Sequence, residues 1–298
     1  MAEACEVQYD MHPRVTIHMT EVPKDLPMVH AFSGFVDAGH SIRQAVSHMT
    51  THLPHQMVAE LSIDDIYDYR ARRPVMTFDR DHFSDIDMPR LTLDLFWDNH
   101  SKPFLMIHGP EPDLGWQQVT GSIIELAEHF KVSKTIGLQA IPWPSPHTRE
   151  LLVTPHASDP TMIEPRPGPV DRVDVPGSLT TLVEFATGRA GIPSQGFAVH
   201  IPHYLVNTEF PTGAITVLEE IARAGGLVID QGDLPRMAAQ VRAEIDESIA
   251  SSTENEEVVA ALEQQHDADV ASWPGELPSG DELMDQIQEF LAGQDDDE

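Results

Sequence analysis

Two carboxylates on one short loop are the residues of this sequence best suited to acid–base chemistry. Glu111 and Asp113 stand beside prolines in the motif His108-Gly-Pro-Glu-Pro-Asp113. Carboxylates on such a stiff loop could act as a general acid and base, or could bind Mg²⁺. The same composition is also typical of a surface turn, because proline and acidic residues both suit turns and water. The motif therefore predicts a candidate site without specifying a reaction.

A second loop, Gly34-x-x-Asp37-Ala-Gly39, lies between a predicted strand and a predicted helix. Backbone N–H groups at a helix N-terminus bind anions, so this loop could hold a phosphate. It has neither the G-x-G-x-x-G fingerprint of dinucleotide sites nor the Gly-Lys-Ser/Thr of a P-loop. Asp37 would also compete with a bound phosphate. We therefore favour a tight turn in which Asp37 caps the helix.

His200 and His203, which are followed by Tyr204, have a spacing that could suggest a metal site. Positions three apart on a strand point to opposite faces, and Pro202 prevents a regular helix there. No acidic partner stands at helical spacing, as metal-binding helices require. We therefore predict no metal site, but a strand end whose histidines bond to nearby backbone groups.

The motif Pro146-His147-Thr148-Arg149 places a cation beside a hydroxyl and an imidazole. Arg149 could hold a carboxylate or a phosphate through two parallel hydrogen bonds. The chain has 18 basic and 49 acidic residues, however, so an internal salt bridge is the more common fate of such an arginine.

Nucleophilic catalysis has little support in this sequence. The Gly-x-Ser-x-Gly elbow of many hydrolases is absent. Cys5 is the only cysteine, so an intramolecular disulfide and a cysteine-based zinc site are excluded. Cys5 also precedes the first core strand, which makes it a poor nucleophile candidate. With no complete catalytic set and no cofactor motif, we expect a protein that is not an enzyme.

The candidate loops follow apolar runs that have the pattern of buried strands, and these alternate with amphipathic helices over residues 27–230. The predicted helices begin at Asp37, after Gly115, at Ser178 and at Pro211, and each has one apolar face. A hairpin or an extended loop is expected over 64–90. The predicted strands are Pro27–Phe32, Met57–Ser62, Leu91–Trp97, Phe104–His108, Thr135–Gln139, Leu151–Thr154, Phe197–Ile201 and Leu227–Asp230.

This alternation predicts an α/β fold, a three-layer α/β/α sandwich around a mostly parallel or mixed sheet. The carboxyl ends of parallel strands meet at one edge of the sheet, so the loops that follow them should form one surface, here called the loop face. Its loops are Phe32–Gly39, His108–Asp113, Ile141–His147 and His200–Tyr204. The candidate binding residues on and beside them are Gly34, Asp37, Gly39, Glu111, Asp113, Trp116, His147, Arg149, His200, His203 and Tyr204.

The composition changes near residue 230, where we expect a domain boundary. Residues 231–298 hold 19 acidic and 2 basic residues, a net charge of −17, against −14 for residues 1–230. The pattern after residue 230 is helical only, and capping residues open helices at Asp233, Thr253 and Ser279. The sequence therefore predicts an α/β core domain over 1–230 and an acidic helical extension over 231–298, with a hinge at Trp273–Gly280 and a solvated acidic tail at Gln294–Glu298.

The formal net charge of −31 bears on the possible partners. Nucleic-acid binding needs clustered lysine and arginine, and an acidic surface is repelled by anionic membranes. We therefore expect neither a nucleic acid nor a membrane as partner. The first residues lack the basic and apolar segments of a signal peptide, and no apolar run approaches the roughly 18 residues of a spanning helix. A cytoplasmic location is expected.

Taken in order, the motifs resemble the proteasome assembly chaperone 2 family, in its actinobacterial branch. The resemblance covers about residues 15–235. It implies a phosphorylase/hydrolase-like α/β/α sandwich that self-associates, and relatives bind proteasome α subunits during assembly of the core particle. The motifs that carry it are Gly34-x-x-Asp37-Ala-Gly39, Gly109-Pro-Glu-Pro-Asp113 followed by Trp116, Pro146-His147-Thr148-Arg149, Gly188-Arg-Ala-Gly191-Ile-Pro193 and His200-Ile-Pro-His203-Tyr204.

One feature departs from this pattern. Family members that dock on the α ring often end in a hydrophobic residue, a tyrosine and one last residue, whereas this sequence ends Gln294-Asp-Asp-Asp-Glu298. Docking by insertion of the tail is therefore not expected.

Two functions remain open from the sequence. The first is a non-enzymatic chaperone-like or scaffold protein that binds proteasome subunits or another protein through the loop face. The alternative is a small-molecule or nucleotide-binding enzyme, ligase-like or hydrolase-like, that uses the same face. A deep pocket with several candidate side chains would favour the enzyme, and a flat apolar surface would favour the interface. The apolar stripes of the C-terminal helices also predict a homo-oligomer, with a trimer as the expected state.

Overall fold

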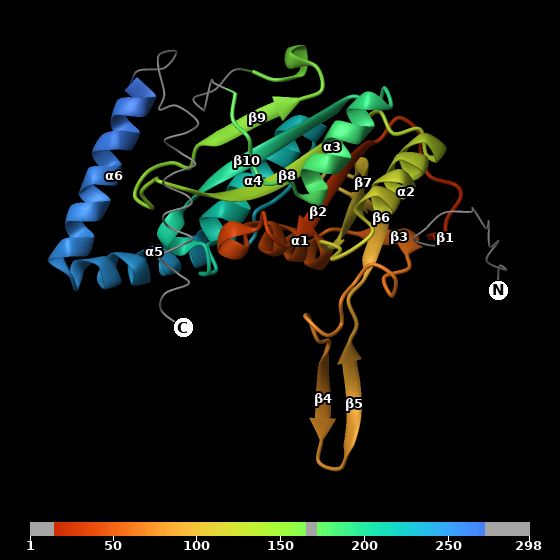
Figure 1. Ribbon diagram of the computed structural model, residues 1–298, viewed down its shortest axis with the longest axis horizontal. Helices are drawn as coiled ribbons and strands as arrows, with labels where there is room; N and C mark the ends of the chain where they lie inside the picture. Colours follow the sequence, from red (N-terminus) through yellow and green to blue (C-terminus); the bar gives the residue numbers. More distant parts are fainter. Residues whose placement is uncertain (1–14, 165–171, 272–298) are drawn as a thin grey trace.

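A single eight-stranded mixed sheet forms the centre of the computed structural model, which describes residues 15–164 and 172–271 (Figure 1). The strand order is β1-β3-β6-β7-β2-β8-β10-β9. The four central strands run parallel: β7 (Pro103–Pro110), β2 (Pro27–Ser33), β8 (Lys134–Trp143) and β10 (Ser194–Pro202). The outer strands are antiparallel to their neighbours: β1 (Val15–Ile17), β3 (His55–Leu61) and β6 (Leu91–Trp97) at one edge, and β9 (Val153–Ala157) at the other.

Helices cover both faces of this sheet, which confirms the predicted three-layer α/β/α sandwich. On one face the core is built from α1 (Ser41–His52), α4 (Pro211–Gly225) and α5 (Leu234–Ala250). On the other it is built from α2 (Trp116–His129) and α3 (Leu179–Arg189). The central strands lie between these layers, so they are buried at successive positions, as β2 is from Pro27 to Phe32.

The helices on the sheet begin where the sequence predicted, except for the first one. The short 3₁₀ turn η1 (Ala38–His40) precedes α1, because Gly39 has a φ of 63° and interrupts the helix. The first helix therefore begins at Ser41, four residues later than expected. The other starts agree with the sequence: Ser178 and Thr181 form a capping box at α3, and Pro211 opens α4.

The observed strands differ from the predicted ones in two places. The segment Leu227–Asp230 is a loop instead of a last strand, because the Val228 N–H donates to the Asp98 carboxylate 2.8 Å away and so makes no ladder bond. The short edge strand β1 was not predicted.

The insertion 64–90 contains a β-hairpin that projects from the rest of the molecule (Figure 1). Its strands are β4 (Val75–Asp79) and β5 (His82–Asp87), which form their own two-stranded sheet. Every residue of both strands is exposed. One of the two predicted possibilities, the hairpin, is therefore the one observed.

In the described residues, the part after residue 230 contains two helices, α5 and α6 (Thr253–Ala271), at the end of the molecule opposite β1 (Figure 1). The predicted boundary at residue 230 remains a prediction; Leu234 and Ile245 of α5 belong to the same buried cluster as α4. The expected hinge at Trp273–Gly280, the helix from Ser279 and the acidic tail lie outside the described residues. None of the described helices has the length and hydropathy needed to cross a bilayer.

Candidate functional site

The four loops predicted to form the loop face follow the four parallel strands β2, β7, β8 and β10. The register aligns the strand ends, since Ser33 pairs with Pro110 and Pro202 pairs with Trp143. The loops therefore do lie along one edge of the sheet. The position of each candidate side chain on this edge decides what the surface can do.

Glu111 is buried and connects three segments. One carboxylate oxygen accepts a hydrogen bond from the Leu179 N–H at 2.7 Å, at the start of α3. The other accepts from the Phe35 N–H at 3.3 Å. A carboxylate at a helix N-terminus satisfies a free donor and interacts favourably with the helix dipole. Gly34 is required for this contact, because a Cβ there would lie 2.7 Å from the Glu111 side chain. Glu111 is thus a helix cap and a loop clamp.

The side chain of Asp37 caps α1, as the sequence predicted, but Asp37 lies three residues before the N-cap position, which His40 occupies. Its Oδ1 accepts from the Ile42 N–H at 2.7 Å and, more weakly, from the Arg43 N–H at 3.4 Å. Burial raises the pKa of Asp37 to about 6, against the partial compensation of these hydrogen bonds. Gly39 lies against Phe210, and its left-handed conformation closes the turn. This loop is therefore a capped turn whose acceptor is already used.

Asp113 joins the loop after β7 to the base of the hairpin. Its Oδ2 accepts from Arg72 at 2.7 Å and from the Asp68 N–H at 2.6 Å. Burial alone would raise the pKa of Asp113, but these hydrogen bonds outweigh it and lower the pKa. In the same loop the Trp116 indole donates to the Pro112 carbonyl at 2.6 Å. Glu111 and Asp113 therefore bond to different segments and do not form an acid–base pair.

His147 lies in a chain of hydrogen bonds to Tyr204 and Asp246. The Tyr204 hydroxyl accepts from the His147 backbone N–H at 2.8 Å and lies 2.7 Å from the imidazole Nδ1. The imidazole Nε2 lies 2.9 Å from the Asp246 carboxylate on α5. Because that carboxylate is an acceptor, Nε2 carries the proton and the Tyr204 hydroxyl donates to Nδ1. Burial raises the pKa of Tyr204 to about 12, so the hydroxyl keeps its proton at neutral pH.

Arg149 forms the internal salt bridge that the sequence favoured. Its guanidinium holds both carboxylate oxygens of Asp267, at 2.8 and 2.9 Å, and also Glu263 at 3.0 Å. These hydrogen bonds raise the pKa of Arg149. Asp267 and Glu263 are on α6. We use the term C-terminal latch for the bonds from His147 and Arg149 to α5 and α6.

His200 and His203 lie on either side of the strand end, but the prediction that the histidines bond to backbone groups is wrong for His200, whose Nε2 lies beside a side-chain hydroxyl. His200 is fully buried in β10, where its ring stacks on Trp143 at 3.9 Å and its Nε2 lies 2.9 Å from the Thr154 hydroxyl. Burial lowers the pKa of His200 to about 3. His203 lies in the turn η3 (His203–Leu205), with its ring edge-on to Tyr204. Within the described residues, no group of three or more histidine, cysteine or acidic side chains is arranged to hold a metal ion.

Apart from His203 and Tyr204, which line a groove beside α5 and α6, the candidate side chains therefore do not converge on a shared cavity. They cap helices, bind neighbouring loops or form the latch. Two residues that the sequence analysis did not single out are the exposed apolar groups of this edge. Phe35, after β2, is 64% exposed, and Leu114, after β7, is 60% exposed. Their exposure could not be inferred from the sequence, because apolar residues between strand and helix are equally compatible with burial.

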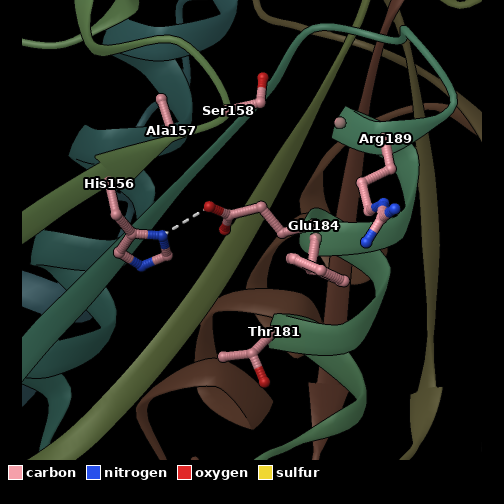
Figure 2. A pocket seen from close by; sticks show the side chains of 8 residues that line it. His156, Ala157, Ser158, Thr181, Glu184 and Arg189 are labelled. Carbon is pink, nitrogen blue, oxygen red and sulfur yellow. Dashed lines mark hydrogen bonds and ion pairs between the residues drawn. The ribbon is translucent and has the colours of Figure 1, made fainter. Parts of the chain in front are cut away.

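A cavity of about 420 Å³ lies elsewhere, between α3 and the edge strand β9 (Figure 2). Glu184 reaches from α3 toward His156, whose Nδ1 is 2.7 Å from the carboxylate (Figure 2). Thr181, Arg189 and Ser158 also line this cavity. It contains none of the predicted site residues.

A row of aligned residues across four strands explains how the side chains of this cavity fit. His30, Gly137, Gly196 and His156 are register partners on β2, β8, β10 and β9. A Cβ on Gly137 would lie 2.6 Å from His30, and one on Gly196 would lie 2.2 Å from Glu184. The two glycines thus make room for bulky polar groups beneath α3. Glycine within a strand was the available sequence signal for this close approach.

The comparisons with known proteins give one family and a set of solved structures. A family model described as "PAC2 family" matches residues 31–249. A crystal structure of the Mycobacterium tuberculosis protein of unknown function Rv2714 is 38% identical, with a TM-score of 0.82, and the match covers 89% of this chain and 92% of that one. No curated protein matches.

Two further structures have names that refer to the proteasome. The Mycobacterium tuberculosis proteasome-assembly chaperone homologue Rv2125 is 25% identical, with a TM-score of 0.72, over 78% of this chain and 100% of that one. The Pyrococcus furiosus protein PbaB, an archaeal proteasome activator, is 14% identical with a TM-score of 0.60, over 78% of this chain and 97% of that one. At that identity the second likeness shows a shared fold only.

Proposed function

Because the chain belongs to the PAC2 family, we propose that it is a non-enzymatic, chaperone-like or scaffold protein that binds a protein partner through the loop face. The similarity to a proteasome-assembly chaperone homologue makes proteasome subunits the first partner to test. A cytoplasmic location is part of this proposal.

The observation that carries the proposal is that the polar side chains on the loop face are already engaged in hydrogen bonds and salt bridges within the protein. Catalysis needs an acid, a base or a nucleophile within reach of substrate. Glu111 and Asp37 instead accept from backbone N–H groups of neighbouring helices, and Arg149 is held by two carboxylates of α6. Groups engaged in this way stabilise a rigid surface and are poorly suited to act on a substrate.

The exposed groups on this edge also support an interface. Phe35 and Leu114 follow adjacent parallel strands, and their loops are joined through Glu111. Exposed aromatic and aliphatic side chains on a rigid edge have the character of anchors in protein–protein interfaces.

A binding measurement with purified components tests this proposal. The immobilised protein is titrated with recombinant proteasome α subunits from the organism that encodes the chain. Wild type is expected to bind, and Phe35→Ser with Leu114→Ser is expected to weaken binding by about tenfold. Phe185→Ser is the matched control, since Phe185 is 62% exposed but lies on α3 beside the cavity of Figure 2. No binding by wild type, or equal weakening by the control, would remove the proposal.

We further propose that the protein is a homo-oligomer, with a trimer as the expected state. The hairpin gives this proposal a stronger basis than the C-terminal helices do. An isolated two-stranded hairpin is at best marginally stable in water. This one exposes Met76, Phe78, Phe83 and Ile86, which are 43% to 63% accessible to solvent. A neighbouring copy would cover these side chains.

The alternative of a small-molecule or nucleotide-binding enzyme is now best placed at the cavity between α3 and β9. That cavity has a carboxylate–imidazole pair, Glu184 and His156, with the Arg189 guanidinium nearby. Thermal-shift measurements with nucleotides, phosphoesters and purines test it. A ligand at one hundred times its Kd stabilises the folded state by about 2.7 kcal/mol, which is readily measured. If none of these compounds raises the Tm, the alternative loses its support.

A further inference from the structure

A groove of about 410 Å³ lies between η3, α5 and α6, next to the C-terminal latch. Its floor is apolar and comes from three elements: Leu205 of η3, Val241, Ile245 and Ile249 of α5, and Val258 and Val259 of α6. His203 and Tyr204 line one side, so the groove borders the loop face. The latch fixes its walls, because His147 and Arg149 hold α5 and α6 to the sheet.

The floor has the geometry that receives a helix. Val241, Ile245 and Ile249 are spaced four residues apart, so they form one stripe along α5. Val258, which is 47% exposed, faces this stripe from α6. An amphipathic helix binds such a surface by inserting apolar side chains at helical spacing.

The rim of the groove is acidic. Glu244 lines it, and Glu254 precedes Val258, which also lines the groove, by one turn of α6. Both are exposed, and neither has an ion-pair partner among the described residues. By contrast, Asp246, Glu263 and Asp267 of the same helices are bound in the latch. The groove therefore combines an apolar floor with uncompensated negative charge.

We propose that this groove binds an amphipathic, positively charged helical segment of a partner protein. The inference rests on the proposed function, since it names the chemistry of a partner at the border of the loop face. Lysine or arginine on the polar side of such a helix would meet Glu244 and Glu254, and its leucine-like side chains would cover the floor. Opposite charges across an interface favour the right partner and speed association.

The same charge argument disfavours one occupant that the protein itself could supply. Residues 272–298 of this chain contain 9 acidic residues and no basic one. Like charges at close range oppose that contact.

Fluorescence anisotropy of the full-length protein with a designed peptide tests the proposal. The probe is a labelled Leu/Lys peptide of about 14 residues, long enough to form a helix of about 21 Å. A peptide of the same composition, scrambled so that its leucines no longer share a face, is the control for nonspecific charge attraction. The helical probe is expected to bind at least tenfold more tightly than the scrambled one.

Two valines on α6 provide matched variants. Val258→Asp is expected to weaken binding of the helical probe by about tenfold or more. Val270→Asp is expected to leave it unchanged, because Val270 is 45% exposed on the same helix but does not line the groove. Replacement of Glu244 and Glu254 by glutamine is expected to weaken binding and to reduce its salt dependence.

Several results would overturn the proposal. Equal effects of the two valine variants, or equal affinity for the scrambled peptide, would show that the groove is not the binding site. A tighter affinity for the probe after deletion of residues 272–298 would identify this chain's own tail as the occupant. A lower mass of Val258→Asp in light scattering would identify a second copy. The binding of α subunits through Phe35 and Leu114 is tested by different variants, so the proposed function can hold even if this inference fails.

Discussion

The imidazole of His147 has both nitrogens engaged, one with the Tyr204 hydroxyl and one with the Asp246 carboxylate. The backbone carbonyl of His147 also accepts a hydrogen bond from Arg242 at 3.0 Å. Hydrogen bonds that join a tyrosine, a histidine and an aspartate would suggest catalysis. Here the side chain of His147 is only 1% exposed, so substrate could not reach it. The same hydrogen bonds are better suited to fixing a helix against a loop.

The carboxyl group of Asp37 is expected to make stability depend on pH. Its pKa is about 6 in the folded protein and 3.8 when unperturbed. The folded state therefore holds the proton more tightly, and this contribution is complete below about pH 4 and is lost as the pH rises through 6. Asp37→Asn removes the buried charge while its amide oxygen still accepts from Ile42. We expect the variant to be about 3 kcal/mol more stable than wild type at pH 7 and nearly equal in stability near pH 4.

Urea unfolding of both proteins at the two pH values measures this difference. Other carboxyl groups titrate alike in the two proteins, so only the difference between their free energies of unfolding matters. A variant that is less stable than wild type at pH 7 would show that the ionised carboxylate, as a cap, outweighs its burial.

The salt bridges of Arg149 are expected to control the mobility of α6. Arg149→Ala removes the contacts to Asp267 and Glu263, and α6 has few buried residues of its own to replace them. Faster amide hydrogen exchange is expected over 253–271, with the sheet unchanged. Arg236→Ala is the control, because Arg236 forms an ion pair with Asp233, at the start of its own helix, and with no other described residue. Unchanged exchange over 253–271 would contradict the role given to the latch.

At the residue scale, the sequence predicted the kind of interaction that a side chain makes better than it predicted the residue with which the side chain interacts. The excess of acidic residues correctly indicated that Arg149 would be neutralised internally. It could not identify Asp267, since 49 acidic residues were available and the pair is 118 positions apart. The cap by Asp37 was predictable because it depends only on residues a few positions away.

At the scale of elements, the hairpin is expected to carry the self-association. Its two phenylalanines, Phe78 and Phe83, are paired across the strands with ring centroids 5.2 Å apart. We expect Phe78→Ser with Phe83→Ser to convert the oligomer to a monomer in light scattering at micromolar concentration. Val75→Ser is the matched control, because Val75 is 72% exposed on the same strand but pairs with Asp87 instead of an apolar residue. A monomeric wild type would refute the oligomer itself.

Most elements of the sheet and its helices were predictable because apolar periodicity and capping residues act locally. The segment Leu227–Asp230 shows the limit of this reasoning. Its sequence has a strand-like apolar start, but the side chain of Asp98, 130 positions away, accepts a hydrogen bond from the Val228 N–H. The hairpin was left as one of two possibilities because its strands have no helix or sheet to bury them, so the sequence carries little periodic signal.

At the scale of the whole molecule, two truncations are expected to separate the roles of α5 and α6. Leu234 and Ile245 of α5 are buried in the main cluster, whereas α6 meets the sheet mainly through the latch. Ending the chain after Ala250 is expected to change the Tm by only a few degrees. Ending it after Gly232 should lower the Tm by roughly 10 °C, because two large apolar side chains are lost from the core. Differential scanning calorimetry measures both, and equal Tm values would support a boundary at residue 230.

The latch also has a consequence for the order in which the protein is completed during synthesis. It joins His147 to Asp246 and Arg149 to Asp267, pairs 99 and 118 positions apart. Chains emerge from the ribosome at about 5–20 residues per second, and domains generally fold as units as they emerge. The sheet therefore has all its strands several seconds before α6 is available. During that interval the nascent protein has its loop face but no latch and no groove, so a partner that needs the groove can recognise only a finished chain.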